Sequence, residues 1–268
     1  MNNVHLAFVF TLFAGLATGI GSIIALLGHA TSRRFLSVAL GFSAGVMIYI
    51  SMIEIFFNAR ESLTSAFGAG PGYWATIAAF FAGIAFIAVI DKLVPSDENP
   101  HEMHTLEEME RPQAAQRFKR LHRTGIFVAL AIAIHNFPEG LATFMAALSD
   151  PRLGVAIAVA IAIHNIPEGI SVSVPIYYAT GSRKKAFGYS FLSGLSEPAG
   201  ALIGYFLLRP FLNEAVFGIV FAAVAGIMVY ISFDELLPAA REFGEHHLSI
   251  YGLIGGMVVM SVSLAMFA

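Results

Sequence analysis

Apolar residues gather in eight long runs along the chain, and short polar stretches separate most of them. A helix needs roughly 20 mostly apolar residues to cross the hydrocarbon core of a bilayer, and each run is long enough. The runs lack the alternation of a membrane strand, so the pattern predicts membrane-spanning helices and not a barrel. The predicted spans are Val4–Gly28, Phe35–Phe57, Tyr73–Val94, Thr124–Leu148, Leu153–Tyr178, Ala186–Leu208, Ala215–Leu237 and Leu248–Phe267.

One connection between the spans is long. Residues 95–123 include the polar stretch "PSDENPHEMHTLEEMERPQ", whose composition predicts a mobile loop. Its histidines, His101 and His104, are expected to be solvated loop residues rather than metal ligands. Residues 1–268 are therefore predicted to form a single all-α transmembrane domain with eight helices and one long loop.

Composition narrows the class of protein further. Hydrophobic residues make up 57% of the chain and charged residues only 12%, with a mean hydropathy of +0.75. An ordinary soluble domain is about one-quarter charged. The absence of Cys excludes disulfides and thiolate metal sites. A net charge of −3 leaves no electrostatic footprint for a nucleic-acid partner.

The basic residues predict an orientation in the bilayer. Three of the fifteen Lys and Arg residues, Arg60, Arg152 and Arg209, fall in connections on one side, and the other twelve fall on the opposite side. Cytoplasmic connections carry the excess of Lys and Arg. Since eight spans put both termini on one side, both are predicted to lie outside the cytoplasm. The membrane would be the inner membrane if the source is bacterial.

A sequence repeat relates the two ends of the chain. "AGVMIYISMIEIFFNARE" at 44–61 resembles "AGIMVYISFDELLPAARE" at 225–242. The two copies lie in spans two and seven, which run in opposite directions in the predicted topology. This pattern indicates an inverted repeat in which spans one to three match spans six to eight. Spans four and five would lie between them, in a 3+2+3 arrangement typical of transporters.

A second repeat puts polar residues midway along spans four and five. "AIAIHNFPEG" at 131–140 is followed by "AIAIHNIPEG" at 160–169. In each copy the His and Glu are four residues apart and the Asn and Glu three apart, so they share a helix face. A charged side chain at the bilayer centre costs about 2.5–3.5 kcal/mol on insertion scales. The candidate residues are His135, Asn136, Glu139, His164, Asn165 and Glu168.

A bound divalent cation would remove the cost of these carboxylates and their mutual repulsion. Imidazole nitrogen with carboxylate and amide oxygen suits zinc, iron, manganese, cobalt or cadmium, and the lack of Cys argues against Cu(I). The alternative is that the motifs only join two helices by hydrogen bonds, worth about 0.6–2 kcal/mol each. Two ionisable Glu residues are a poor choice for so small a gain.

A further acidic residue interrupts span six. Glu197, in "SGLSEPAG", is a candidate ligand from the next helix. The alternative is an inward-facing Glu whose hydrogen bonds come from Ser193 or Ser196. Prolines accompany the motifs: Pro138 and Pro167 have no N–H, so kinked or broken helices are expected beside the polar residues.

Spans two and seven also carry acidic residues in equivalent places. These are Glu54 in span two and Glu235, with its neighbour Asp234, in span seven. They would either extend the path of the ion or lie at the membrane interface, because they are close to the predicted helix ends. The sequence leaves both interpretations open.

Taken together, these features resemble the ZIP (Zrt-, Irt-like protein) family of divalent-metal transporters, and most of all its bacterial ZupT branch. "HNFPEG" followed by "HNIPEG" is the specific signal. The likeness extends over essentially the whole chain, including the eight spans, the external termini and the cytoplasmic loop between spans three and four. The segments depart from the HExPHE-type motif of the animal LIV-1 branch, which argues against that assignment.

The resemblance implies a binuclear metal centre bridged by the two motif glutamates, metal flow into the cytoplasm and a homodimer. The ligands that it implies for one ion are His135, Glu139, His164 and Glu168. Those that it implies for the neighbouring ion are Asn136, Glu139, Asn165, Glu168 and Glu197. Some relatives carry Asp in place of Asn165, so its neutral side chain bears on the affinity and metal preference of the second site.

We therefore expect a transporter that takes up Zn²⁺, and with it Fe²⁺, Mn²⁺, Co²⁺ or Cd²⁺, and not an enzyme. The alternative is a membrane-embedded zinc hydrolase, which would need an open water position on the metal and a general base. No HExxH segment occurs in the chain, and an inverted repeat has no obvious use in hydrolysis.

Overall fold

The computed structural model describes residues 2–27, 33–93, 136–211, 213–243 and 246–267. All regular elements in these ranges are helices, as the sequence predicts, and seven continuous helical segments among them are long and apolar enough to cross a membrane. The predicted loop at 95–123, with His101 and His104, lies outside the described residues, and so does His135.

Most helices begin and end within a few residues of the predicted spans. The single-helix spans are α1 (Asn2–Leu27), α4 (Ala69–Leu93), α7 (Pro151–Thr180) and α12 (His246–Phe267). Residues 136–149 are also helical and form the described part of predicted span four.

Spans two and seven each contain a π-helical turn. Span two consists of α2 (Arg33–Ile50), the π turn Ser51–Ile55 and α3 (Phe56–Phe67). Span seven consists of α10 (Glu214–Ile231), the π turn Ser232–Leu236 and α11 (Leu237–Phe243). The two turns fall at matching positions of the sequence repeat, and π turns are rare and frequently occur at functional sites.

Span two is longer than predicted, because α3 continues ten residues past the expected end at Phe57 to Phe67. Arg60 therefore lies on a helix and not in a connection, and its guanidinium carbon sits 3.9 Å from the centre of the Phe57 ring. Ala59 and Leu63 of α3 are buried.

The motif proline of span five, where a kink is expected, does not interrupt the helix. Helix α7 continues through Pro167 to Thr180. The helix break occurs instead in span six, where Leu195 separates α8 (Arg183–Gly194) from α9 (Ser196–Leu208). Pro198 has no N–H to donate to the carbonyl of Gly194, which removes a hydrogen bond at this point.

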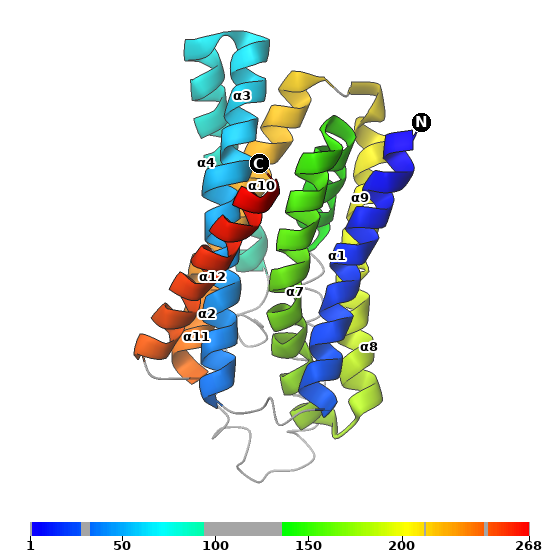
Figure 1. The fold of residues 1–268 in the computed structure, drawn as a ribbon, viewed down its shortest axis with the longest axis vertical. Helices are drawn as coiled ribbons and strands as arrows, with labels where there is room; N and C mark the ends of the chain where they lie inside the picture. Colours follow the sequence, from blue (N-terminus) through cyan, green and yellow to red (C-terminus); the bar gives the residue numbers. More distant parts are fainter. Residues whose placement is uncertain (1, 28–32, 94–135, 212, 244–245, 268) are drawn as a thin grey trace.

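The helices lie roughly side by side and alternate in direction (Figure 1). Helix α1 descends in this view, α2 and α3 rise, α4 descends, α7 descends, α8 and α9 rise, α10 and α11 descend, and α12 rises. The two marked chain ends both lie in the upper half of the view. This agrees with the prediction that both termini are on one side and that spans two and seven run in opposite directions.

Close contacts between helices divide the molecule into two bundles. In the first bundle, α1 packs along α7, α8 and α9. In the second, α2 packs along α12, and α10 packs along α3 and α4. Residues 136–149 belong to the first bundle, because a Cβ added at Gly140 would clash with the backbone of Glu197 in α9. The main contact between the bundles is that of α2 with α7.

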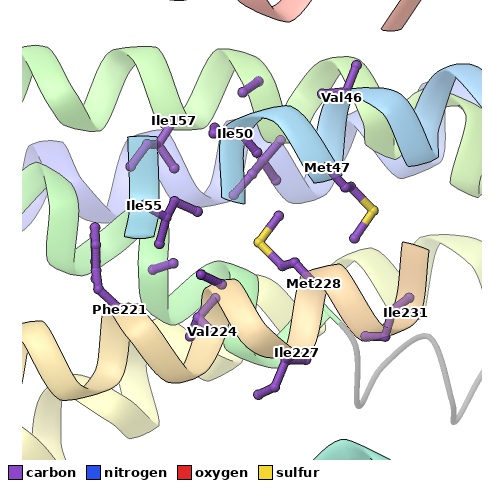
Figure 2. Close-up of a cluster of buried hydrophobic side chains, with 14 of the residues drawn as sticks. Val46, Met47, Ile50, Ile55, Ile157, Phe221, Val224, Ile227, Met228 and Ile231 are labelled. Atoms are coloured by element: carbon purple, nitrogen blue, oxygen red, sulfur yellow. The ribbon is translucent and has the colours of Figure 1, made fainter. Parts of the chain in front are cut away.

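Aliphatic side chains fill the space between the bundles. Figure 2 shows Met47 and Ile50 of α2 with Ile157 of α7 and Met228 of α10 in one cluster. Each of these four side chains is fully buried. The interface between the bundles is therefore mostly apolar and contains few directional bonds.

Candidate metal centre

Three ligand-type side chains meet inside the first bundle. Glu139 comes from the helix at 136–149, and His164 and Glu168 come from α7. One potential ligand atom from each lies within 4.8 Å of those of the other two, and His164 Nε2 is 3.1 Å from Glu139 Oε2. Their side chains are at most 3% exposed. We call these three residues the ligand cluster.

The chemistry of the ligand cluster fits a transition-metal ion. Zn–N and Zn–O bonds are about 2.0–2.2 Å long, so two ligand atoms of one ion are at most about 4.4 Å apart. A small inward movement of the side chains would close the cluster around an ion. Without a cation, two carboxylates would be buried side by side, and one of them would have to take up a proton.

Hydroxyl groups from neighbouring helices hold the backbone beneath the ligands. Ser43 of α2 donates to the carbonyl of His164 at 3.3 Å. Ser22 of α1 and Ser190 of α8 both donate to the carbonyl of Gly169, each at 3.3 Å. These bonds fix the motif turn of α7 from three sides.

The motif asparagines and Glu197 lie next to the ligand cluster. Asn165 donates through Nδ2 to the carbonyl of Ala14 at 2.9 Å and also to Glu197 Oε1. Asn136 donates through Nδ2 to the carbonyl of Ser193 at 3.5 Å. Asn136, Asn165 and Glu197 are all fully buried.

The alternative interpretation of Glu197 is wrong. The hydroxyls of Ser193 and Ser196 donate to backbone carbonyls, those of Ser190 and Ser193, and not to the carboxylate. The described partner of the Glu197 carboxylate is the motif residue Asn165. The structure thus brings Glu197 to the same buried region as the two motifs.

The acidic residues of spans two and seven lie apart from the ligand cluster. Glu54 occurs in the π turn of span two, and Asp234 and Glu235 occur in that of span seven. Both turns lie within long helices and not at their ends. Glu54 also accepts a hydrogen bond from Asn58 Nδ2 at 3.0 Å.

Glu54 lines a large cavity near one end of the bundles. The cavity has a volume of about 880 Å³ and is lined by both polar and apolar side chains. Its lining includes Glu54, Asn58, Glu61, Asp150, Arg152 and Glu214. Met145 and Ala156 lie deeper, on the helix at 136–149 and on α7, and are almost completely buried.

The sequence did not reveal all the polar groups near the centre. Thr18 of α1 and Ser43 of α2 are fully buried and sit beside the motif helices. Neither belongs to a recognisable motif, because single Ser and Thr residues are common in membrane helices. The glycine that ends each motif carried a usable signal: a Cβ at Gly140 or Gly169 would clash with the backbone of a neighbouring helix.

Membrane-length helices that enclose a buried cluster of His, Asn and Glu define a multi-pass membrane protein with a candidate metal site in its interior. The chain belongs to the ZIP zinc transporter family, whose model matches residues 92–264. This family consists of transporters and not of enzymes, so the hydrolase alternative is excluded.

Relatives of known name match the chain over nearly its full length. The zinc transporter ZupT of Clostridium perfringens is 63% identical over 278 aligned residues, which cover 100% of this chain and 98% of the relative. The zinc transporter ZupT of Nitratidesulfovibrio vulgaris is 65% identical, with 99% and 98% covered. That of Oceanobacillus iheyensis is 61% identical, with 100% of both chains covered.

Proposed function

We propose that the protein takes up zinc across the cell membrane into the cytoplasm, and that iron, manganese, cobalt and cadmium ions can follow the same route. The observation that carries the proposal is the ligand cluster, in which Glu139, His164 and Glu168 converge inside an apolar bundle. The full-length relatives named as zinc transporters support zinc as the main substrate.

The site holds two ions in this proposal. The ligand cluster, completed by His135, binds the first. The second lies toward Asn136, Asn165 and Glu197 and shares the two motif glutamates as bridges. The burial of these residues beside the ligand cluster supports this arrangement, since only an added positive charge would balance three carboxylates at this depth.

The helices are arranged as a 3+2+3 inverted repeat in this proposal. Glycine contacts between α2 and α12 support it, since a Cβ at Gly45 would clash with Leu253 O and one at Gly256 with Phe42 O. The matching contacts between α4 and α10 join Gly226 to Phe80 O and Gly83 to Ala223 O. Phe42 and Gly45 correspond to Ala223 and Gly226, which lie 181 residues later in the chain. Phe80 and Gly83 correspond in the same way to Leu253 and Gly256, which lie 173 residues later.

The cation enters through the cavity that Glu54 lines. From Met145 on the cavity floor to Glu139 is six residues, or about 9 Å along a helix. The acidic lining attracts cations. Aliphatic side chains between the bundles block the path from the cavity floor to Glu139 in this arrangement. Glu235 is the counterpart of Glu54 in the other repeat. With its neighbour Asp234, it contacts the cation on the path at the opposite side of the membrane.

Transport occurs when the first bundle moves against the second. The motifs, Glu197 and their glycine contacts all belong to the first bundle, so the site would move as one body. The interface with the second bundle is mostly aliphatic and offers little resistance to sliding or rocking. Such motion would close the cavity at Glu54 and expose the site on the other side.

The termini lie outside the cytoplasm in this proposal, and the membrane is the inner membrane if the source is bacterial. The exposed apolar faces, such as that of α1 with Val9, Phe13 and Ile20, contact lipid. The homodimer stays a prediction, which crosslinking in vesicles would test.

Zinc uptake by purified protein in sealed vesicles tests the function. Wild-type protein should accumulate zinc in the lumen, and Glu168→Ala should reduce uptake to the level of empty vesicles. Lys184→Ala is the control, because Lys184 is exposed at the start of α8 and belongs neither to the ligand cluster nor to the lining of the cavity. Zinc binding without accumulation by the wild-type protein would contradict the proposal.

A further inference from the structure

The second half of span two supplies a polar wall of the cavity. The residues of this wall are Glu54, Asn58, Glu61, Ser62 and Ser65. Their spacing of four, three, one and three residues puts them on one face of a helix. Asn58 differs from the other residues of the wall, because its side-chain amide is hydrogen-bonded to one of the acidic side chains, that of Glu54.

The amide of Asn58 contacts Glu54 at two points. Its Nδ2 donates to the backbone carbonyl of Glu54 at 2.8 Å and to the carboxylate oxygen Oε1 at 3.0 Å. An amide nitrogen carries two protons, so each of these oxygens can take one of them. The bond to the backbone fixes the amide, and the amide in turn fixes the carboxylate. Glu54 is therefore held in one orientation on the cavity wall.

A basic side chain lines the same cavity without neutralising Glu54. Arg152 belongs to the lining, and it is exposed. Among the residues that the structure describes, no ion pair joins Arg152 to Glu54 or to another acidic side chain. A cation that enters the cavity thus meets a Glu54 carboxylate that an uncharged amide holds in place.

The other copy of the sequence repeat shows that the helix itself does not require this amide. The counterpart of Glu54 is Glu235, and the counterpart of Asn58 is Ala239, each 181 residues later. Alanine has no side-chain donor, yet a π turn also forms there, at Ser232–Leu236. The bond from Asn58 is therefore not needed to form the turn, and its effect falls on the carboxylate of Glu54.

We propose that Asn58 is a positioning residue for cation entry, which holds the Glu54 carboxylate in the orientation that receives the ion from the cavity. This inference rests on the proposed function, because the ion is the transported zinc and the cavity is its entrance. A side chain that is already ordered loses less conformational freedom when the ion binds, so binding is tighter. Asn58 should therefore set the zinc concentration at which uptake is half-maximal, and not the rate at which the bundles move.

Removal of the amide tests this role. Zinc uptake into vesicles is measured over a range of zinc concentrations for the wild type, Asn58→Ala, Glu54→Ala and the double variant. Thr64→Ala is the matched control on α3: its hydroxyl also donates to a backbone carbonyl, that of Glu61 at 3.0 Å, but Thr64 does not line the cavity. Circular dichroism and size-exclusion chromatography establish folding, and Asn58→Leu, which keeps the volume, replaces the alanine variant if that fails to fold.

Asn58→Ala should raise the KM for zinc about fivefold, the loss of one hydrogen bond to a charged group, and leave the maximal rate within about twofold. In the Glu54→Ala background the same substitution should change KM by less than about twofold, because the side chain that it positions is gone. Thr64→Ala should match the wild type. An unchanged KM in Asn58→Ala, or an equal rise with and without Glu54, would overturn the positioning role.

A second measurement separates this inference from the transport function. Wild-type protein that accumulates no zinc would overturn the transport function, and the role of Asn58 is then decided by zinc protection of a thiol in the cavity. Ala156→Cys supplies the thiol, because position 156 lines the cavity. The zinc concentration that halves its labelling rate should rise about fivefold with Asn58→Ala and stay unchanged with Thr64→Ala. Equal protection in both variants would overturn the role of Asn58.

Discussion

The two copies of the motif differ in sequence by a single residue over ten positions, yet their surroundings are unlike. Beside the second copy, Asn165 contacts the carboxylate of Glu197. A Cβ at Gly140 of the first copy would clash with the carbonyl of Glu197. One at Gly169 of the second would clash with that of Thr18 on α1, so the residue at the position equivalent to Glu197 is Thr18, a neutral hydroxyl. The two motif copies are thus nearly identical, but the negative charge next to them lies on the Glu197 side and not on the Thr18 side.

A second difference concerns the helices of the other bundle. Ser43 of α2 donates to the carbonyl of His164 in the second copy. The residue 181 positions later, on α10, is Val224, which has no donor. The comparison teaches that the motifs define which atoms can bind a metal, while their neighbours decide how the two sides of the centre differ.

The largest expected contrast is between the two ends of the molecule. In the cysteine-free chain, Ser65→Cys on α3 and Ser182→Cys before α8 should react with a membrane-impermeant maleimide from opposite faces, with Ser182 cytoplasmic. The reason is that these elements lie at opposite ends of the bundles (Figure 1). Labelling is measured in intact cells and in inverted vesicles.

Label on both cysteines from one face would contradict the eight-span arrangement. A cysteine at Met257 in the middle of α12 is the control, because a buried or lipid-facing position should stay unlabelled from either side.

The next largest effect should be common to both motif copies. Glu139→Gln and Glu168→Gln should each reduce zinc affinity more than about 100-fold, because removal of one partner from a buried charged site typically costs about 3–5 kcal/mol. The two losses should be similar, since both residues belong to the ligand cluster. Calorimetric titration of zinc into purified protein measures both. A variant with nearly normal affinity would remove that glutamate from the site.

The charge difference between the two sides should give a smaller effect. Glu197→Gln should reduce the zinc bound from two ions to one per chain and weaken uptake about tenfold, because the second ion loses its own carboxylate. Adding Thr18→Asp to this variant should restore part of the binding by moving the charge to the equivalent position. Metal analysis after dialysis gives the stoichiometry. Two ions retained by Glu197→Gln would contradict the proposed second site.

Much of this architecture could be predicted from the sequence. Long apolar runs mark the membrane spans, and the two repeats indicate which helices correspond and which polar residues share a helix face. The spans, the directions of α2 and α10, and the meeting of Glu139 with His164 all followed from it. The helix break at Leu195 did not, because a proline inside a membrane helix can be accommodated, as Pro167 is in α7.

The role of single hydroxyl groups also escaped prediction, for a physical reason. A buried hydroxyl donates to a carbonyl of its own helix only if that carbonyl does not already accept a hydrogen bond from another side chain. For Thr18 that other side chain is Asn165, which donates to the carbonyl of Ala14 and is 147 residues away from Thr18 in the sequence. The π turns are similar, since the sequence repeat indicated matching positions for Glu54 and Glu235 but not the change of helix type.

The smallest expected effect concerns the bond between the bundles. Ser43→Ala removes the hydrogen bond to the carbonyl of His164, and a net loss of about 1 kcal/mol would shift the balance between bundle arrangements about fivefold. Ala156→Cys reports on this balance, because position 156 lines the cavity and the introduced thiol should react more slowly when the bundles move and close the cavity.

Ser37→Ala is the matched control: Ser37 is also fully buried in α2, but its hydroxyl has no hydrogen-bond partner among the described residues. Thiol reaction rates are compared in the two backgrounds. Equal rates would mean that the Ser43 bond does not favour this arrangement, and that the asymmetry of the centre lies in its charges alone.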